Sequence, residues 1–220
     1  MTGGTPAISA RDLTVVFGEK KALDIPAFEV APGEVSVVIG PNGSGKTTML
    51  HCLSLLMRPA SGTVTYSGEA VTNQKQALVL RRRLAVVFQE SLLLNTTVWG
   101  NVIIGARLRG ISEPVAKERA RKWLEKFGVA HLANRQARTL SSGESKRVSL
   151  ARAFALEPLV LFLDEPFTAL DSPTRQSLLE DFESVLKEIK VTTVMVTHDR
   201  NEALMLADRV AVLIGGQIRQ

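Results

Sequence analysis

Residues 40–47 read Gly-Pro-Asn-Gly-Ser-Gly-Lys-Thr, which fits the pattern G-x-x-x-x-G-K-[ST] of a loop that binds nucleotide phosphates. The apolar run 35–39 before it predicts a buried strand, and residues 46–57 after it predict a helix. The motif therefore has the strand–loop–helix setting that phosphate binding requires. A chance glycine turn is disfavoured, because average composition gives the full pattern in only about one per cent of such chains. The sequence predicts a nucleotide-binding protein.

The residue types of this loop each suit contact with phosphate. Glycines allow backbone N–H groups to turn toward the phosphates, and the N-terminus of the following helix adds a partial positive charge. The Lys46 ammonium can reach the β- and γ-phosphates, and the Thr47 hydroxyl can hold Mg²⁺. The residues expected to bind the nucleotide are Gly40, Pro41, Asn42, Gly43, Ser44, Gly45, Lys46, Thr47 and Thr48.

Composition and charge limit the classes of function. The 220 residues are 45% hydrophobic, yet no apolar run approaches the 18 residues of a membrane span. The N-terminus shows no secretory signal, which predicts a cytoplasmic location. The lone Cys52 is expected to fill core space. The net charge of +5, which includes Arg81–Arg83, is expected to be solvated surface. An anionic membrane is a less favoured partner, and nucleic acid is disfavoured because aromatics are scarce.

Strand and helix patterns alternate along most of the chain, which predicts an α/β fold. Residues 8–17 and 22–30 are expected to be strands, and 61–68 a hairpin strand. The pattern between about 91 and 155 is helical. Beyond it the expected elements are strands at 159–163, 192–197 and 210–214, and helices at 172–190 and 201–207. No internal repeat or low-complexity linker divides the chain, so we expect one domain.

A second candidate site is Leu161-Phe-Leu-Asp-Glu-Pro166. The apolar residues predict a buried strand whose carboxyl end carries Asp164, the position at which ligands lie in open α/β sheets. Asp164 is suited to Mg²⁺, and Glu165 to polarising an attacking water as a general base. The structural alternative is a strand end that meets solvent, and the upstream phosphate loop favours the functional interpretation.

The third site is Leu140-Ser-Ser-Gly-Glu144, followed by Ser145-Lys-Arg-Val148. With the first two sites, it makes the chain resemble the nucleotide-binding domain of ATP-binding cassette (ABC) proteins over all 220 residues. The family signature is Leu-Ser-Gly-Gly-Gln, so Ser142 and Glu144 depart from it. The resemblance implies that Leu140, Ser141, Ser142, Gly143 and Glu144 face ATP held by another subunit. A capping box at the start of a helix is the structural alternative.

The resemblance also implies a RecA-like P-loop core with an N-terminal antiparallel β subdomain and an α-helical subdomain inserted at about 91–155. Phe17 matches the family's adenine-stacking aromatic, with a core or surface ring as its structural alternative. Gln89 matches the residue that binds ATP and Mg²⁺, and Asp171 a dimer-interface residue. His198 matches the histidine near the γ-phosphate. Lys46, Glu165 and His198 are then the expected catalytic residues, and Thr47, Gln89 and Asp164 the metal ligands. His51 and His131 are given no role.

The partners implied by the resemblance are a second copy of the chain and separate membrane subunits. ATP would join the two copies head to tail, and hydrolysis would release them. The apolar loop 92–98 is expected to receive a short helix of a transmembrane permease, with burial against the helical subdomain as the alternative. Such a subunit would lie at the cytoplasmic face of the membrane and serve an extracytoplasmic solute-binding protein indirectly.

The pattern around residues 81–89, 107–110 and 138–144 looks most similar to the tungstate/molybdate importer branch of the family. Two other classes are weighed against an importer. An ABC ATPase of an export, lipoprotein-release or cell-division complex stays open. An ABC ATPase that acts on DNA is disfavoured, because those proteins insert long coiled coils between the phosphate loop and the signature.

Overall fold

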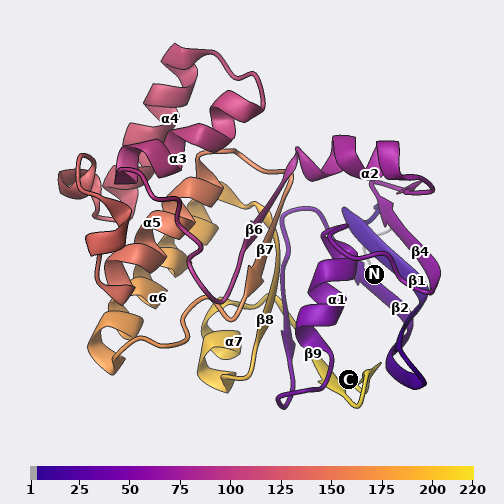
Figure 1. Ribbon diagram of the computed structural model, residues 1–220. Helices are drawn as coiled ribbons and strands as arrows, with labels where there is room; N and C mark the ends of the chain where they lie inside the picture. Colours follow the sequence, from indigo (N-terminus) through magenta and orange to yellow (C-terminus); the bar gives the residue numbers. More distant parts are fainter. Residues whose placement is uncertain (1–3) are drawn as a thin grey trace. The chain divides into compact units, whose positions relative to one another are not determined.

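The computed structural model describes residues 4–220, which form two compact units (Figure 1). The first comprises the chain up to Leu84 together with Val160–Glu165 and Lys190–Gln220. The second comprises Ala85–Leu159 and Pro166–Ile189. The N-terminal prediction about a secretory signal involves residues 1–3, which lie outside the described residues. The expected helical segment 91–155 lies within the second unit, which also takes in residues 166–189.

An antiparallel sheet forms the N-terminal part of the first unit. Its strands follow the order β2 (Lys20–Val30), β1 (Ile8–Phe17), β4 (Ser61–Tyr66) and β5 (Glu69–Ala70). Leu13 pairs with Ile25 and Ala10 with Phe28, and all four side chains are buried. The alternation of apolar and polar residues thus places one face of the hairpin in the core. The predicted hairpin strand 61–68 ends at Tyr66, because Ser67 and Gly68 have positive φ and turn the chain into β5.

A mainly parallel sheet positions the phosphate loop within the same unit. Neighbouring strands are β10 (Gln217–Ile218), β9 (Arg209–Ile214), β3 (Val35–Ile39), β8 (Thr192–Thr197) and β7 (Val160–Asp164). Strand β3 pairs in parallel with both β8 and β9, and β7 pairs in parallel with β8. The carboxyl ends of β3, β7 and β8 therefore meet at one edge, where ligands bind in such sheets.

The helices of the first unit are α1 (Lys46–Leu53), α2 (Gln74–Arg81) and α7 (Arg200–Leu206). Helix α1 ends at Leu53, earlier than the predicted Met57, because Leu55 has a φ of 62° and turns the chain out of the helix. Cys52 is buried as expected, and burial raises the pKa of its thiol to about 11. Strand β6 (Leu84–Val87) begins at Leu84, the last residue of the N-terminal segment of the first unit.

The second unit is built from helices around an aromatic core. They are α3 (Val98–Leu108), α4 (Glu113–Lys126), α5 (Ser142–Phe154) and α6 (Ser172–Ile189), with 3₁₀ turns at Ala130–Leu132 and Ala137–Thr139. The rings of Trp123 and Phe154 lie 4.7 Å apart, and Phe154 and Phe182 6.0 Å apart. This cluster joins α4, α5 and α6. None of the helices in residues 4–220 is both long and apolar enough to cross a membrane.

Candidate nucleotide site

The phosphate loop requires glycine at three positions for different reasons. Gly43 and Gly45 have φ of 76° and 102°, values that other residues rarely adopt. Gly45 is also the residue directly before α1. At Gly40 a Cβ atom would lie 2.2 Å from the Leu213 carbonyl oxygen, so only glycine fits beside β9. Backbone geometry and close packing thus explain the glycine spacing in the sequence.

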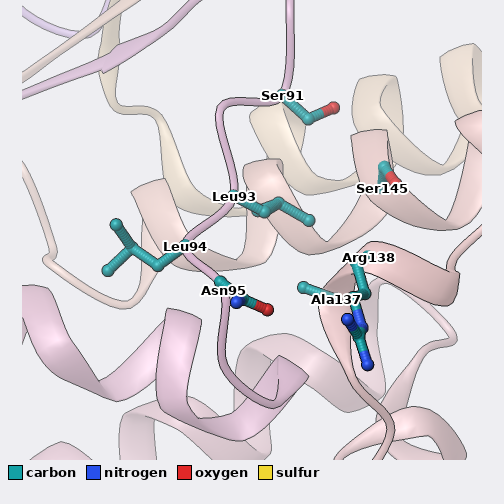
Figure 2. A pocket seen from close by; sticks show the side chains of 7 residues that line it. All are labelled: Ser91, Leu93, Leu94, Asn95, Ala137, Arg138 and Ser145. Carbon is teal, nitrogen blue, oxygen red and sulfur yellow. The ribbon is translucent and has the colours of Figure 1, made fainter.

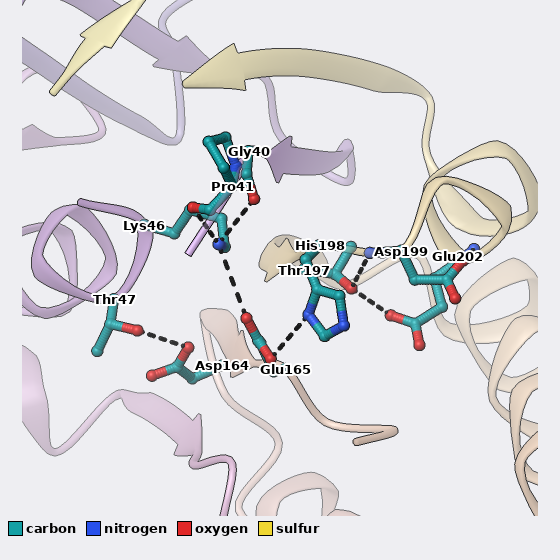
Figure 3. Close-up of polar contacts among 10 residues, drawn as sticks. All are labelled: Gly40, Pro41, Lys46, Thr47, Asp164, Glu165, Thr197, His198, Asp199 and Glu202. Atoms are coloured by element: carbon teal, nitrogen blue, oxygen red, sulfur yellow. Dashed lines mark hydrogen bonds and ion pairs between the residues drawn. The ribbon is translucent and has the colours of Figure 1, made fainter. Parts of the chain in front are cut away.

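Lys46 brings a buried positive charge to this loop. Its side chain is 5% exposed, and its Nζ donates to the carbonyl oxygens of Gly40 at 2.9 Å and Pro41 at 3.1 Å. Nζ also lies 3.7 Å from Glu165 Oε1 (Figure 3). A phosphate at the loop would meet this ammonium, the loop amides and the positive end of α1 together.

Thr47 and Asp164, which the sequence predicts to bind a metal, are in direct contact. Thr47 Oγ1 donates to Asp164 Oδ1 at 3.0 Å, and Asp164 is 6% exposed at the end of β7. Burial raises the pKa of Asp164, and the Thr47 hydrogen bond and the nearby His51 act against it. A hydroxyl and a desolvated carboxylate at one point are the oxygen ligands that Mg²⁺ prefers, so these residues fit that ion.

Glu165 and His198 lie side by side at the ends of neighbouring strands. Glu165 Oε2 and His198 Nδ1 are 3.0 Å apart, so the carboxylate lies between the histidine and Lys46 (Figure 3). Glu165 has a φ of 44°, and its amide donates to Val196 O at 2.9 Å. Left-handed backbone at a residue other than glycine is strained and is concentrated at functional sites. Here it turns Glu165 away from the direction of β7.

The backbone around His198 is fixed from both sides by a buried network. Thr197 Oγ1 donates to Glu202 Oε2 at 2.5 Å and accepts from the Asp199 amide at 3.1 Å. Asp199 Oδ1 in turn accepts from the first amides of α7. Glu202 is 3% exposed. The exposed His198 ring therefore stands on a rigid base beside Glu165.

Phe17 ends β1 with its side chain on the surface. The residue is 54% exposed, which rules out the core alternative. It pairs with Lys20 across the hairpin turn. An exposed aromatic face is available for stacking, so the prediction that Phe17 contacts adenine stays open.

The signature residues lie in the second unit, at the N-terminus of α5. Ser141 caps the helix, its Oγ accepting from the Glu144 amide at 3.2 Å, and Glu144 Oε2 accepts from the Ser141 amide at 2.7 Å. That bond from the Ser141 amide is the main cause that lowers the pKa of Glu144. The capping box considered from the sequence is thus present. Because Ser141 and Ser142 are also exposed, the cap and a trans role for these residues are compatible.

Gly143, Gln89 and Asp171 also lie in the second unit. A Cβ on Gly143 would lie 2.6 Å from Thr174 Cγ2, which explains the glycine at that position of α5. The Gln89 carbonyl accepts from Lys146 Nζ. Asp171 Oδ1 accepts from the Thr174 amide at 3.0 Å, and this bond lowers the Asp171 pKa. Asp171 is exposed in the single chain, which is compatible with the prediction that it lies at a subunit interface.

Three residues near these sites were missed by the sequence analysis. His51 acts on the pKa of Asp164 and could have been found from its i+4 spacing after Thr47 on α1. Glu202 lies four residues after His198, in the first turn of α7. Lys146 gave no signal, since a lysine in a polar helix N-terminus is ordinarily solvated.

A pocket of about 280 Å³ opens beside the predicted docking loop of the second unit. Its lining residues come from three segments: Ser91, Leu93, Leu94, Asn95, Ala137, Arg138 and Ser145. Figure 2 shows Leu93 pointing across the pocket toward Arg138. Leu92 and Leu94 are 57% and 51% exposed. Leu93 is half-buried and Val98 is buried, so the loop packs against the helices only in part.

The nucleotide-site geometry and the fold define an ATP-binding cassette, and comparison with known proteins agrees. The chain belongs to the ABC transporter family, whose profile matches residues 23–168. It is 40% identical over 217 residues to the sulfate/thiosulfate import ATP-binding protein CysA of Mycobacterium bovis, covering 98% of this chain. It is 41% identical over 218 residues to the protein of that name in Caulobacter vibrioides, covering 97% of this chain. It spans 61% and 63% of the length of these two relatives.

Solved structures confirm the predicted fold. CbiO1 from Clostridium perfringens, part of the ABC transporter complex cbiONQ, matches with a TM-score of 0.89 at 27% identity, covering 98% of this chain and 88% of that one. The ATP-binding cassette MJ0796, in a dimeric post-hydrolysis state bound to ADP and Pi, matches with a TM-score of 0.86 at 28% identity, covering 97% of each chain. The predicted α/β fold and the class, an ABC-type ATPase that binds ATP, are confirmed.

Proposed function

We propose that this chain is the ATP-hydrolysing subunit of an ABC importer, folded as one ATPase domain with an inserted helical subdomain. The observation that carries the proposal is the group of Lys46, Thr47, Asp164, Glu165 and His198 at one edge of the parallel sheet of the first unit. Phosphate binding, metal binding and a general base are the parts that hydrolysis of a γ-phosphate needs.

Each residue has a distinct part in this proposal. The loop 40–48 and Lys46 bind the phosphates of ATP, and Phe17 stacks on the adenine. Glu165 orients and deprotonates the attacking water, and the His198 contact fixes the direction of its carboxylate. Thr47, Asp164 and Gln89 would hold Mg²⁺, which supplies charge neutralisation at the β- and γ-phosphates.

The proposed active form is a head-to-tail homodimer. The N-terminus of α5, with the exposed Ser141 and the backbone of the buried Gly143, would contact the γ-phosphate of ATP held by the partner subunit. Asp171 would lie at the same interface. A capped helix N-terminus is a suitable anion contact. The dimeric state described for the MJ0796 cassette supports this assembly.

The proposed partner of the pocket lined by Leu93, Leu94 and Arg138 is a short helix of a transmembrane permease. An exposed Leu94 and a half-buried Leu93 beside a guanidinium suit an amphipathic helix that carries a carboxylate. The chain would then sit on the cytoplasmic face of the membrane, with a solute-binding protein acting indirectly and with no nucleic acid involved.

The proposed solute is a tetrahedral oxyanion. The signature-region resemblance favoured tungstate or molybdate, whereas the curated relatives are named for sulfate/thiosulfate import. These solutes share shape and charge class, which supports the choice of a tetrahedral oxyanion.

Uptake by cells that carry Leu93→Asp tests the proposal. An unpaired charge in the docking pocket should abolish uptake while ATP hydrolysis by the purified chain stays near normal. Comparing sulfate, thiosulfate, tungstate and molybdate in the gene deletion identifies the solute. Unchanged uptake of all four solutes in the deletion strain would reject the proposal that the solute is one of these oxyanions. Co-purification of the chain with an export or cell-division complex, instead of an importer permease, would reject the proposal that it serves an importer.

A further inference from the structure

An ion pair joins the segment before the signature to the signature itself. Arg135 Nη1 lies 3.4 Å from Glu144 Oε1, and the two side chains are 46% and 29% exposed. Glu144 Oε2 accepts from the Ser141 amide at 2.7 Å, so both carboxylate oxygens have a partner. All three residues belong to the second unit. The acidic side chain of the signature is therefore held between a cation and a backbone amide.

The direction of the Arg135 guanidinium is fixed by contacts other than the one with Glu144. Its Nε donates to Thr139 Oγ1 at 3.1 Å, and its Nη2 donates to the Thr139 carbonyl at 2.7 Å. The Arg135 backbone is also held, since its amide donates to Leu132 O at 2.8 Å and its carbonyl accepts from the Val98 amide at 2.9 Å. Nη1 is the nitrogen that is directed at the carboxylate. The cation is thus placed by the folded segment that carries it.

Glu144 brings a negative charge to a helix end that is proposed to face phosphate. The bond from the Ser141 amide is the main cause that lowers the pKa of Glu144, and the charges of Arg135 and His131 act in the same direction. Glu144 is the third residue of α5, so its backbone lies only about 4.5 Å along the helix axis from Ser141. The Debye length at physiological salt is longer, about 8 Å, so salt alone would not screen this carboxylate from that phosphate.

Folding stability gives this ion pair little to do, because exposed pairs contribute little to it. A like charge that faces an anion across an interface, in contrast, weakens association strongly. We propose that Arg135 is the counter-charge for Glu144, which allows the acidic signature of this chain to bind the γ-phosphate of ATP held by the partner subunit. The glutamine of the family signature is uncharged and would need no such cation. This inference rests on the proposed function and adds a residue to its site. Arg135 acts through Glu144 and is therefore a positioning residue.

ATP-dependent dimerisation of the full chain tests the counter-charge. The parent is the Glu165→Gln protein, which should hold Mg·ATP without turnover, and sedimentation velocity measures its dimer dissociation constant. Arg135→Met should raise this constant about tenfold, because the Glu144 charge then faces phosphate without a partner. Adding Glu144→Gln should restore the constant to within about twofold, since an amide oxygen can still accept from the Ser141 amide. A purely structural role of Arg135 would not be rescued in this way.

Further variants separate charge from shape. Arg107→Met is the matched control: it breaks an ion pair of comparable exposure between Arg107 of α3 and Glu113 of α4, and it should leave the dissociation constant unchanged. Arg135→Lys keeps the positive charge but loses the planar fork, and it should weaken the dimer by less than about threefold. Thermal melting shows that each variant is folded. Arg135→Gln, which can still donate to the Thr139 carbonyl, replaces Arg135→Met if the latter does not fold, with the same expected loss.

The outcomes separate the counter-charge from the proposed function. If the parent dimerises with Mg·ATP and the uncharged Arg135 variant dimerises equally well, the counter-charge is wrong and the proposed function stands. The same follows if Glu144→Gln does not rescue that variant, or if Arg107→Met loses as much. If the parent forms no ATP-dependent dimer, the proposed function is wrong and the counter-charge falls with it.

Discussion

The phosphate-loop edge of the first unit and the signature end of α5 in the second unit hold their functional groups in different ways. At the first, Lys46 and Asp164 are buried, and their charges are held by hydrogen bonds to the phosphate loop and to Thr47 of α1. At the second, Ser141 and Ser142 are exposed, and Ser141 is held only within its own capping box. The first region is thus a preorganised catalytic site, and the second is an exposed surface that is free to contact a partner. A head-to-tail dimer requires one region of each kind in every subunit.

The largest expected effect concerns the chemical site. Glu165→Gln keeps the shape of the side chain and removes the general base, so turnover of Mg·ATP should fall by about 10²–10⁴-fold. ATP binding should persist, because Lys46 and the loop are unchanged. A single-turnover assay with a nucleotide-binding titration checks both. Near-normal hydrolysis would remove Glu165 from the proposed mechanism.

The next effect concerns the presented surface. Ser142→Asp adds a carboxylate at the first residue of α5, where the helix end favours it, so the chain should fold at least as stably. Facing phosphate in the dimer, the same charge should lower kcat by about 100-fold, the scale of losing one oriented donor. Ser142→Gly is the matched control and should leave activity intact or raise it. Steady-state kinetics measure the loss of activity, and melting curves measure the retained stability. Equal activity of Ser142→Asp and Ser142→Gly would contradict the prediction.

A smaller effect is expected at the adenine contact. Phe17→Ala should raise the KM for ATP about tenfold and leave kcat nearly unchanged, since stacking is shared by the ground and transition states. The exposed ring packs little, so thermal stability should barely change. A titration with ATP measures the KM, and an unchanged value would make Phe17 an ordinary surface residue.

The smallest effect is one of stability. Burial raises the pKa of Asp164, so its ionised form opposes folding at neutral pH. Asp164→Asn should therefore raise Tm by roughly 2–4 °C without nucleotide, while abolishing Mg²⁺-dependent turnover. The Tm difference should shrink as pH falls through the raised pKa of the folded state, and it should vanish below the ordinary carboxyl pKa of 3.8, where Asp164 is protonated in both states. Melting curves between neutral and acid pH test this; a destabilised variant would contradict it.

Local patterns explain what the sequence could predict. Glycine spacing, an apolar strand and a following helix identified the phosphate loop, and the strand ends located Asp164, Glu165 and His198. The turn at Leu55 that ends α1 is a backbone effect without a glycine or proline signal. The contact of Lys146 with the Gln89 carbonyl joins residues far apart in sequence, and no periodicity reports such a pair. The grouping of 166–189 with the helical unit depends on tertiary packing in the same way.

Mixing two inactive variants tests most directly whether the two regions complete one site in trans. In a Glu165→Gln/Ser142→Asp heterodimer, one site joins an intact Glu165 to an intact signature, and the other site carries both changes. The mixture should recover up to about a quarter of the wild-type ATPase rate, because half of the dimers are mixed and each has one good site of two. A mixture as inactive as its two components would contradict the head-to-tail account.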